Sequence, residues 1–285
     1  MTTKVNNRMI DGAAVNVLDF GADPKGVSDS TTAFQSAIDS INGGKLIVPE
    51  GTYYISSTIQ LRHKNITIVG YGHEYSIINN TNDTEYAFDL FPVAAQTGTV
   101  GVESLGIVSK FGIKTRYDHS TDWENNSNPI KNIRIRDCKF TGKYDDISDS
   151  DAGTPAVTDV SVLDNYGVGL QLSVTYRSDI RNNEFYRYGV GINDSGNTLG
   201  IICQNRFLKC ARHIHSQRTL WAGSSFGLGA EMVIEQNDFL DATHGGGVSM
   251  FNTFGCNFRN NYMEHLDRSG SDSSPVLMYS QNASH

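Results

Sequence analysis

The chain is poor in cysteine, proline and tryptophan, with 4, 6 and 2 copies among its 285 residues. It contains no run of 18 apolar residues, so no helix that spans a membrane is expected. The first residues, MTTKVNNRMIDGAAV, show neither an apolar core nor a cleavage site, so we expect no classical secretion signal. Basic residues are outnumbered, and the formal net charge of −8 argues against nucleic acid or a membrane surface as the main partner.

The few cysteines show no metal-binding spacing. They are Cys138, Cys203, Cys210 and Cys256, and none belongs to a C-x-x-C pair or lies beside a histidine at zinc-finger spacing. We interpret them as free thiols in the core or on the surface, with a disulfide as the alternative. Free thiols suit a chain made in a reducing cytoplasm.

Glycine and aromatic residues are plentiful, with 28 Gly, 13 Tyr and 13 Phe. One amphipathic helix of about three turns is predicted, because apolar residues recur at helical spacing over 34–41. Its cap would be Ser28, Asp29 or Ser30, and it would end at the glycines of 42–44. Short β segments broken by Gly, Pro and Asn follow. A single helix before many strands is expected to cover the open end of a β stack.

A repeat predicts how these strands are arranged. Segments 178–185, 200–207, 232–239 and 256–263 align without gaps, and 133–140 is a looser fifth copy. They place an asparagine at the same position, at Asn183, Asn205, Asn237 and Asn261. A second column of apolar residues shares the period of about 22 residues, at Leu170, Ile192, Ile214 and Val248. Two columns with one period predict an all-β, right-handed parallel β-helix, in which the asparagines stack along the axis.

The N-terminal motifs are similar to those of a known superfamily. They are a D-F-G-A turn at 19–22, a D-x-T-x-A-F-Q helix start at 29–35 and G-G-x-L-x-V-P-x-G-x-Y at 43–53. Together they resemble the start of pectate-lyase-like parallel β-helix proteins, over about 50 residues that are specific for the fold but not for the reaction. The resemblance implies a short segment at 1–16 and a β-helix domain at 17–285 with its cap at 17–45. Because residues 276–278 look like another coil strand, we expect the domain to be incomplete at its C-terminus.

Within this superfamily the chain looks most like bacteriophage tailspike and tail-fibre depolymerases. That resemblance implies a homotrimer in the virion tail, made in the host cytoplasm and assembled with other phage tail proteins. It also implies a bacterial surface polysaccharide, either capsule or O-antigen, as the partner. Catalytic pairs in such spikes can straddle two subunits.

Three reactions on a polysaccharide need different residues. Glycoside hydrolysis needs two carboxylates. A lyase needs a base and a group that neutralises a uronate, often Ca²⁺. An esterase needs a nucleophilic serine, but no G-x-S-x-G is present. We favour hydrolysis because acidic residues are the commonest candidates in the last coils; a lyase or a non-enzymatic receptor-binding fibre is the alternative.

Candidate site residues follow from the stacking of the coils. Residues one coil apart lie about 4.8 Å from each other, and Asp241 and Glu264 fall near the same turn. The predicted catalytic residues are Asp241, Glu264 and Asp267. The predicted substrate-binding residues are His215, Arg218, Trp221, Asn193 and His244.

Other polar residues have structural explanations. His215 is expected on an outward stripe with Gln171, Asn193 and Ser249, which could be solvated rather than bind sugar. Trp221 could cover the core, and Asp194 is expected one coil below His215. Glu235, Asp238 and Glu184 are interpreted as structural, Glu235 as a member of an ion pair. The acidic loop 145–151 alternates like a calcium loop but lacks the EF-hand pattern. No cofactor is therefore expected, with a weak Ca²⁺ site as the alternative.

Overall fold

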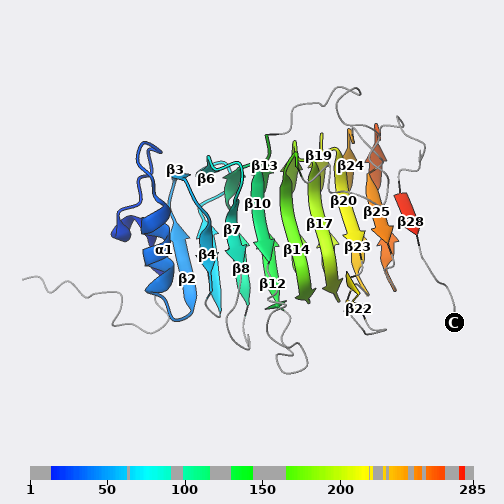
Figure 1. The fold of residues 1–285 in the computed structure, drawn as a ribbon, viewed down its shortest axis with the longest axis horizontal. Helices are drawn as coiled ribbons and strands as arrows, with labels where there is room; N and C mark the ends of the chain where they lie inside the picture. Colours follow the sequence, from blue (N-terminus) through cyan, green and yellow to red (C-terminus); the bar gives the residue numbers. More distant parts are fainter. Residues whose placement is uncertain are drawn as a thin grey trace, which may run out of the picture.

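The chain forms a right-handed parallel β-helix capped by one α-helix, in a computed structural model (Figure 1). The structure describes residues 14–62, 65–90, 99–115, 130–143, 165–217, 219–220, 227–228, 231–242, 247–251, 255–266 and 276–279. Within these ranges no helix is long and apolar enough to cross a membrane. The predicted fold class is confirmed.

Three sheets of parallel strands make up the walls of the β-helix. Sheet A contains β1 (Val15–Asn16), β2 (Gly44–Val48), β5 (Ile66–Gly70), β8 (Val100–Glu103), β12 (Ile133–Arg136), β15 (Asp179–Arg181), β18 (Ile201–Cys203), β23 (Val233–Glu235) and β26 (Asn257–Arg259). Sheet B contains β3 (Gly51–Ile55), β6 (Ser76–Asn80), β9 (Gly106–Val108), β13 (Lys139–Thr141), β16 (Glu184–Tyr186), β19 (Arg206–Leu208), β24 (Asp238–Leu240) and β27 (Tyr262–Glu264). Sheet C contains β4 (Ile59–Leu61), β7 (Tyr86–Leu90), β10 (Phe111–Thr115), β14 (Val168–Tyr176), β17 (Val190–Thr198), β20 (Arg212–Gln217), β25 (Val248–Phe251) and β28 (Val276–Tyr279), with β11 (Ile130–Lys131) beside β14.

Each coil runs through sheets A, B and C in turn. The strand predicted at residues 276–278 is present as β28 at the end opposite the cap (Figure 1). One short antiparallel pair, β21 (Thr219–Leu220) with β22 (Gly227–Leu228), lies outside the three sheets.

The N-terminal cap consists of a 3₁₀ turn, η2 (Val17–Phe20), and the helix α1 (Thr31–Asp39). Phe34 of α1 is fully buried and packs edge-on against Tyr53 of the first coil, with ring centroids 5.5 Å apart. The helix therefore closes the apolar end of the stack, as predicted.

The ends of α1 differ in detail from the prediction. Ser30 is the N-cap residue but makes no side-chain capping bond, whereas the carboxylate of Asp29 accepts a hydrogen bond from the Thr31 backbone N–H at 2.9 Å. The helix has nine residues and ends before the predicted glycines. Its C-cap is Ser40, whose hydroxyl donates to the Ala37 carbonyl at 2.7 Å. A polar side chain thus satisfies the last turn, where a glycine was predicted.

The predicted asparagine ladder is present. Asn183 donates to Asn205 at 2.9 Å, Asn205 to Asn237 at 3.0 Å, and Asn237 to Asn261 at 3.0 Å, each from Nδ2 to Oδ1. Cys138 occupies the equivalent position in the looser repeat, and its backbone N–H donates to the Asn183 side chain at 3.0 Å. The ladder therefore satisfies polar groups in an otherwise apolar interior.

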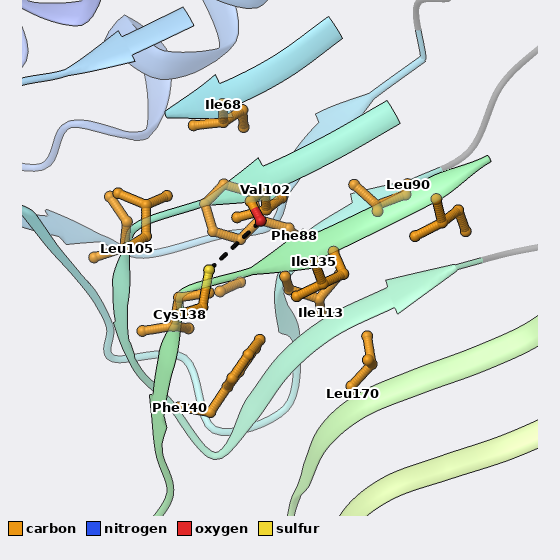
Figure 2. Close-up of a cluster of buried hydrophobic side chains, with 14 of the residues drawn as sticks. Ile68, Phe88, Leu90, Val102, Leu105, Ile113, Ile135, Cys138, Phe140 and Leu170 are labelled. Carbon is orange, nitrogen blue, oxygen red and sulfur yellow. Dashed lines mark hydrogen bonds between the residues drawn. The ribbon is translucent and has the colours of Figure 1, made fainter. Parts of the chain in front are cut away.

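Aromatic rings fill the interior behind sheet B. Phe140, Phe185, Phe207 and Phe239 stack one coil apart, with centroid separations of 4.7, 4.9 and 5.2 Å. Figure 2 shows the start of this column, where the thiol of Cys138 lies among apolar side chains and points to the Val102 carbonyl at 3.5 Å. All four cysteines are free thiols, as predicted. Burial raises the pKa of Cys138 to about 12, so this thiol is unreactive in the folded chain.

Candidate functional site

The predicted pair Asp241 and Glu264 meets at the corner between sheets B and C. Asp241 follows β24 in a left-handed conformation (φ 50°), and His265 takes the same conformation one coil later (φ 50°). The Asp241 backbone N–H donates to the Glu264 carbonyl at 3.1 Å. The parallel stacking of two one-residue turns therefore brings both acids to the same corner, as the repeat predicted.

The side chains at this corner form an open polar cluster. His265 Nδ1 lies 3.3 Å from Asp241 Oδ1 and 3.8 Å from Glu264 Oε1. Because Nδ1 lies this close to both oxygens, the two oxygens are at most about 7.1 Å apart, a limit that includes the spacing of retaining carboxylate pairs and the short end of the inverting range. The side chains of Asp241 and Glu264 are 40% and 46% exposed, so a polymer can reach both.

Tyr262 is a member of this cluster that the sequence reasoning missed. Its hydroxyl donates to Glu264 Oε2 at 2.9 Å, and this bond raises the pKa of Tyr262. The ring is 56% exposed. The sequence could have predicted Tyr262, because residues i and i+2 of a strand lie on the same face and Glu264 was already a candidate.

The stripe of His215 is present but covered. Asn193 and Ser249 are the strand partners of His215 on the two neighbouring coils, as predicted. However, His215 is only 1% exposed and Asn193 only 6%, and His215 Nδ1 lies 2.8 Å from the Ser249 hydroxyl. In this chain neither side chain is open to a polymer, and their role in binding stays a prediction.

The position expected for Asp194 was wrong by one residue. The strand partner of Asp194 is Ser216, whose hydroxyl donates to Asp194 Oδ2 at 3.0 Å, and both side chains are buried. A shift of one residue along a strand moves a side chain to the opposite face, so Asp194 does not lie beneath His215.

Four of the predicted site residues lie outside the described ranges, as does the acidic loop 145–151. These are Asp267, Arg218, Trp221 and His244. Within the described ranges, no group of three or more His, Cys, Asp or Glu residues could hold a metal ion. The ion pair predicted for Glu235 is present, with Arg259 Nε at 2.7 Å. Glu184 likewise lies 3.8 Å from Lys139 in an ion pair.

His213 is a buried histidine that takes no part in this cluster. Its ring lies beside the stacked rings of Phe207 and Phe239, with centroids 5.8 and 5.7 Å away, and its Nε2–H donates to the Leu240 carbonyl at 3.1 Å. Burial lowers the pKa of His213 to about 3. The imidazole is therefore neutral in the folded chain and belongs to the aromatic column.

This burial predicts a pH-dependent stability. The unfolded imidazole keeps its ordinary pKa near 6.5, so below that pH the unfolded state binds a proton that the folded state does not. The contribution is fully present above pH 6.5 and is lost as the pH falls towards 3, by up to about 1.4 kcal/mol per pH unit. His213→Phe keeps the aromatic stack and should flatten this slope in urea unfolding curves recorded over the same range. Equal slopes in the two proteins would show that His213 is not the group responsible.

The comparisons with known proteins agree with this fold and place the chain in a family. A parallel β-helix with a helical N-terminal cap defines the class, and the family described as rhamnogalacturonase A/epimerase, pectate lyase-like, matches residues 14–215. The chain belongs to this family, as its N-terminal motifs predicted. No curated protein matches the chain in sequence.

Solved structures with the same fold include phage proteins and an epimerase. The chain aligns with the ORF18 protein of Geobacillus virus E2 (17% identity, TM-score 0.50), covering 95% of this chain and 62% of that one. It also aligns with the A-module of mannuronan C-5 epimerase AlgE6 from Azotobacter vinelandii (15%, 0.57), covering 93% and 79% of the two chains. A third match is the enzymatically active domain of tailspike protein 2 of bacteriophage CBA120 (14%, 0.53), covering 94% and 46%. At these identities the likeness shows the fold alone.

Proposed function

We propose that this chain is the β-helix of a bacteriophage tailspike that binds a bacterial surface polysaccharide, capsule or O-antigen, and cleaves it by glycoside hydrolysis. The observation that carries the proposal is the exposed pair Asp241 and Glu264, held on adjacent coils within reach of His265. The phage proteins among the solved structures of this fold support the viral setting. In that setting the chain acts as a homotrimer, joined to other tail proteins in the virion tail.

The two acids have different neighbours at the corner. Glu264 accepts a hydrogen bond from the Tyr262 hydroxyl, which fixes the position of its carboxylate, whereas Asp241 lies nearer to the His265 ring. Together they supply the proton donor and the base or nucleophile that hydrolysis requires. The exposed ring of Tyr262 supplies a flat surface next to the reacting bond.

The test uses the purified protein and a panel of bacterial capsule and O-antigen polysaccharides. Product length, new reducing ends and the ultraviolet absorbance of unsaturated sugars are followed together. We expect shorter chains and new reducing ends without a rise in absorbance. A rise in absorbance would mean a lyase, and binding without shortening would mean a receptor-binding fibre; either result would overturn the hydrolytic mechanism.

A further inference from the structure

Three of the most exposed large hydrophobic side chains in the described part are tyrosines in sheet B or in the turn that leads into it. Tyr71 and Tyr75 precede β6 near the capped end and are 65% and 61% exposed. Tyr262 lies in β27 and is 56% exposed. Because Tyr71 and Tyr75 lie in one short turn, they expose apolar surface at one place, and such a patch marks a binding surface.

The turn that carries Tyr71 and Tyr75 is held in place by the backbone. The Gly72 N–H donates to the Ser104 carbonyl of the next coil at 3.2 Å, and the Tyr75 N–H donates to the Gly72 carbonyl at 2.9 Å. The Tyr71 N–H donates to the Ser76 hydroxyl at 2.9 Å. Gly72 has φ 135°, and a Cβ there would lie 3.0 Å from the ring of Tyr75, so this ring covers the glycine backbone. The backbone that carries both tyrosines is therefore fixed before a ligand binds, and the Tyr75 ring also lies against Gly72, which lowers the entropy cost of binding.

The same turn also carries polar side chains. Glu74 lies between the tyrosines and pairs with Lys139 Nζ at 2.8 Å. His73 Nδ1 lies 3.2 Å from the Asp137 carbonyl. The turn therefore offers flat apolar rings beside hydrogen-bonding groups, which is the combination that a sugar ring requires, since a pyranose has apolar faces and a hydroxyl rim.

The outer face of sheet B connects this turn with the acidic corner. Going from β6 to β27 takes six strand steps, which is about 29 Å at about 4.8 Å per step. One outward column along this face alternates in charge, through Lys139, Glu184, Arg206 and Asp238, and ends at Tyr262. The core of a protein–protein interface is depleted of charged residues, so this column fits a hydrophilic polymer better than a second protein.

We propose that Tyr71 and Tyr75 form a remote binding subsite for a long polysaccharide, which runs along the outer face of sheet B to Asp241 and Glu264. This inference rests on the proposed function, and it adds that the substrate is a long polysaccharide rather than a short oligosaccharide. The separation exceeds the length of a tetrasaccharide, so only longer chains reach both ends. Because the subsite lies far from the reacting bond, it contributes to binding of the ground state and the transition state equally.

The experiment compares Tyr71→Ala/Tyr75→Ala with the wild type on two probes. One is the panel polysaccharide that the wild type binds most tightly, and the other is the tetrasaccharide prepared from it. We expect KM for the polymer, or Kd if no cleavage occurs, to rise about tenfold or more, because the alanine variant removes both exposed aromatic surfaces that a sugar ring can pack on. The kcat for the polymer and both constants for the tetrasaccharide should not change. The matched controls are Tyr71→Phe/Tyr75→Phe, which keeps the rings, and Val27→Ala, an 81% exposed apolar residue near the cap; both should resemble the wild type.

The possible results separate this inference from the proposed function. Polymer binding that is unchanged in the alanine variant, or lost equally for both probes, would overturn the subsite while hydrolysis at Asp241 and Glu264 still stands. A wild-type protein that binds no polysaccharide of the panel would overturn both. Circular dichroism and the melting temperature of the alanine variant should match the wild type, since substitutions of exposed side chains change stability by about 0.5 kcal/mol or less.

Discussion

Asp241→Asn and Glu264→Gln should each reduce the kcat of polysaccharide hydrolysis by about 10²–10⁴-fold, the usual contribution of a positioned acid or base. Both changes keep the shape of the side chain but remove the carboxylate. The Asp241 backbone N–H can still donate to the Glu264 carbonyl, so the corner itself should be retained. The measurement is the initial rate of reducing-end formation on the polysaccharide that the wild type cleaves. The double variant should lose little more than the worse single variant, because residues that act as a unit are not additive.

Asp238→Asn provides the matched control for these variants. Asp238 is an exposed carboxylate of the same sheet and is the strand partner of Tyr262, but within the described residues it forms no hydrogen bond or ion pair with Asp241 or Glu264. We expect its kcat to equal that of the wild type. A normal kcat for Asp241→Asn would contradict the paired-carboxylate mechanism, and Asp267, the third predicted acid, would then be the first alternative to replace.

Phe207→Ala should lower the free energy of unfolding by about 3–5 kcal/mol, the range for removing a large aromatic side chain from a core. Phe207 is fully buried and stacks on Phe185 and Phe239, with ring centroids 4.9 and 5.2 Å away. In a solenoid each coil contacts only its neighbours, so the cavity weakens the packing on both sides of one coil. The measurement is urea unfolding followed by circular dichroism and tyrosine fluorescence together.

The graded control for this cavity is Phe207→Leu, which keeps much of the buried volume and should cost less than the alanine variant. Val27→Ala removes an exposed apolar side chain and should change stability by about 0.5 kcal/mol or less. A loss below about 1 kcal/mol for Phe207→Ala would mean that the interior collapses around the gap, contrary to the close packing expected of protein cores.

Much of the acidic corner could be predicted because it depends on the repeat. Once Asn237 and Asn261 are aligned, Asp241 and Glu264 must lie on adjacent coils at one corner, whatever surrounds them. The prediction for Asp194 shows the limit of this reasoning. When the alignment of a strand is wrong by one residue, a side chain expected on the outer face lies on the inner face. The helix end at Ser40 was missed because its hydroxyl bonds to Ala37, a local contact that the glycine pattern does not reveal.

Local pattern was therefore enough to define the coil, its asparagine ladder and its capping helix, because each depends on residues of one kind recurring at a fixed period, about 22 residues for the coils and helical spacing for the cap. Exposure was decided only by the tertiary structure. His215 lies on an outward stripe yet is 1% exposed, whereas Tyr71 remains 65% exposed in a turn that the sequence did not distinguish. The physical reason is that strand alternation sets the direction of a side chain, but its accessibility depends on which distant parts of the chain pack over that face.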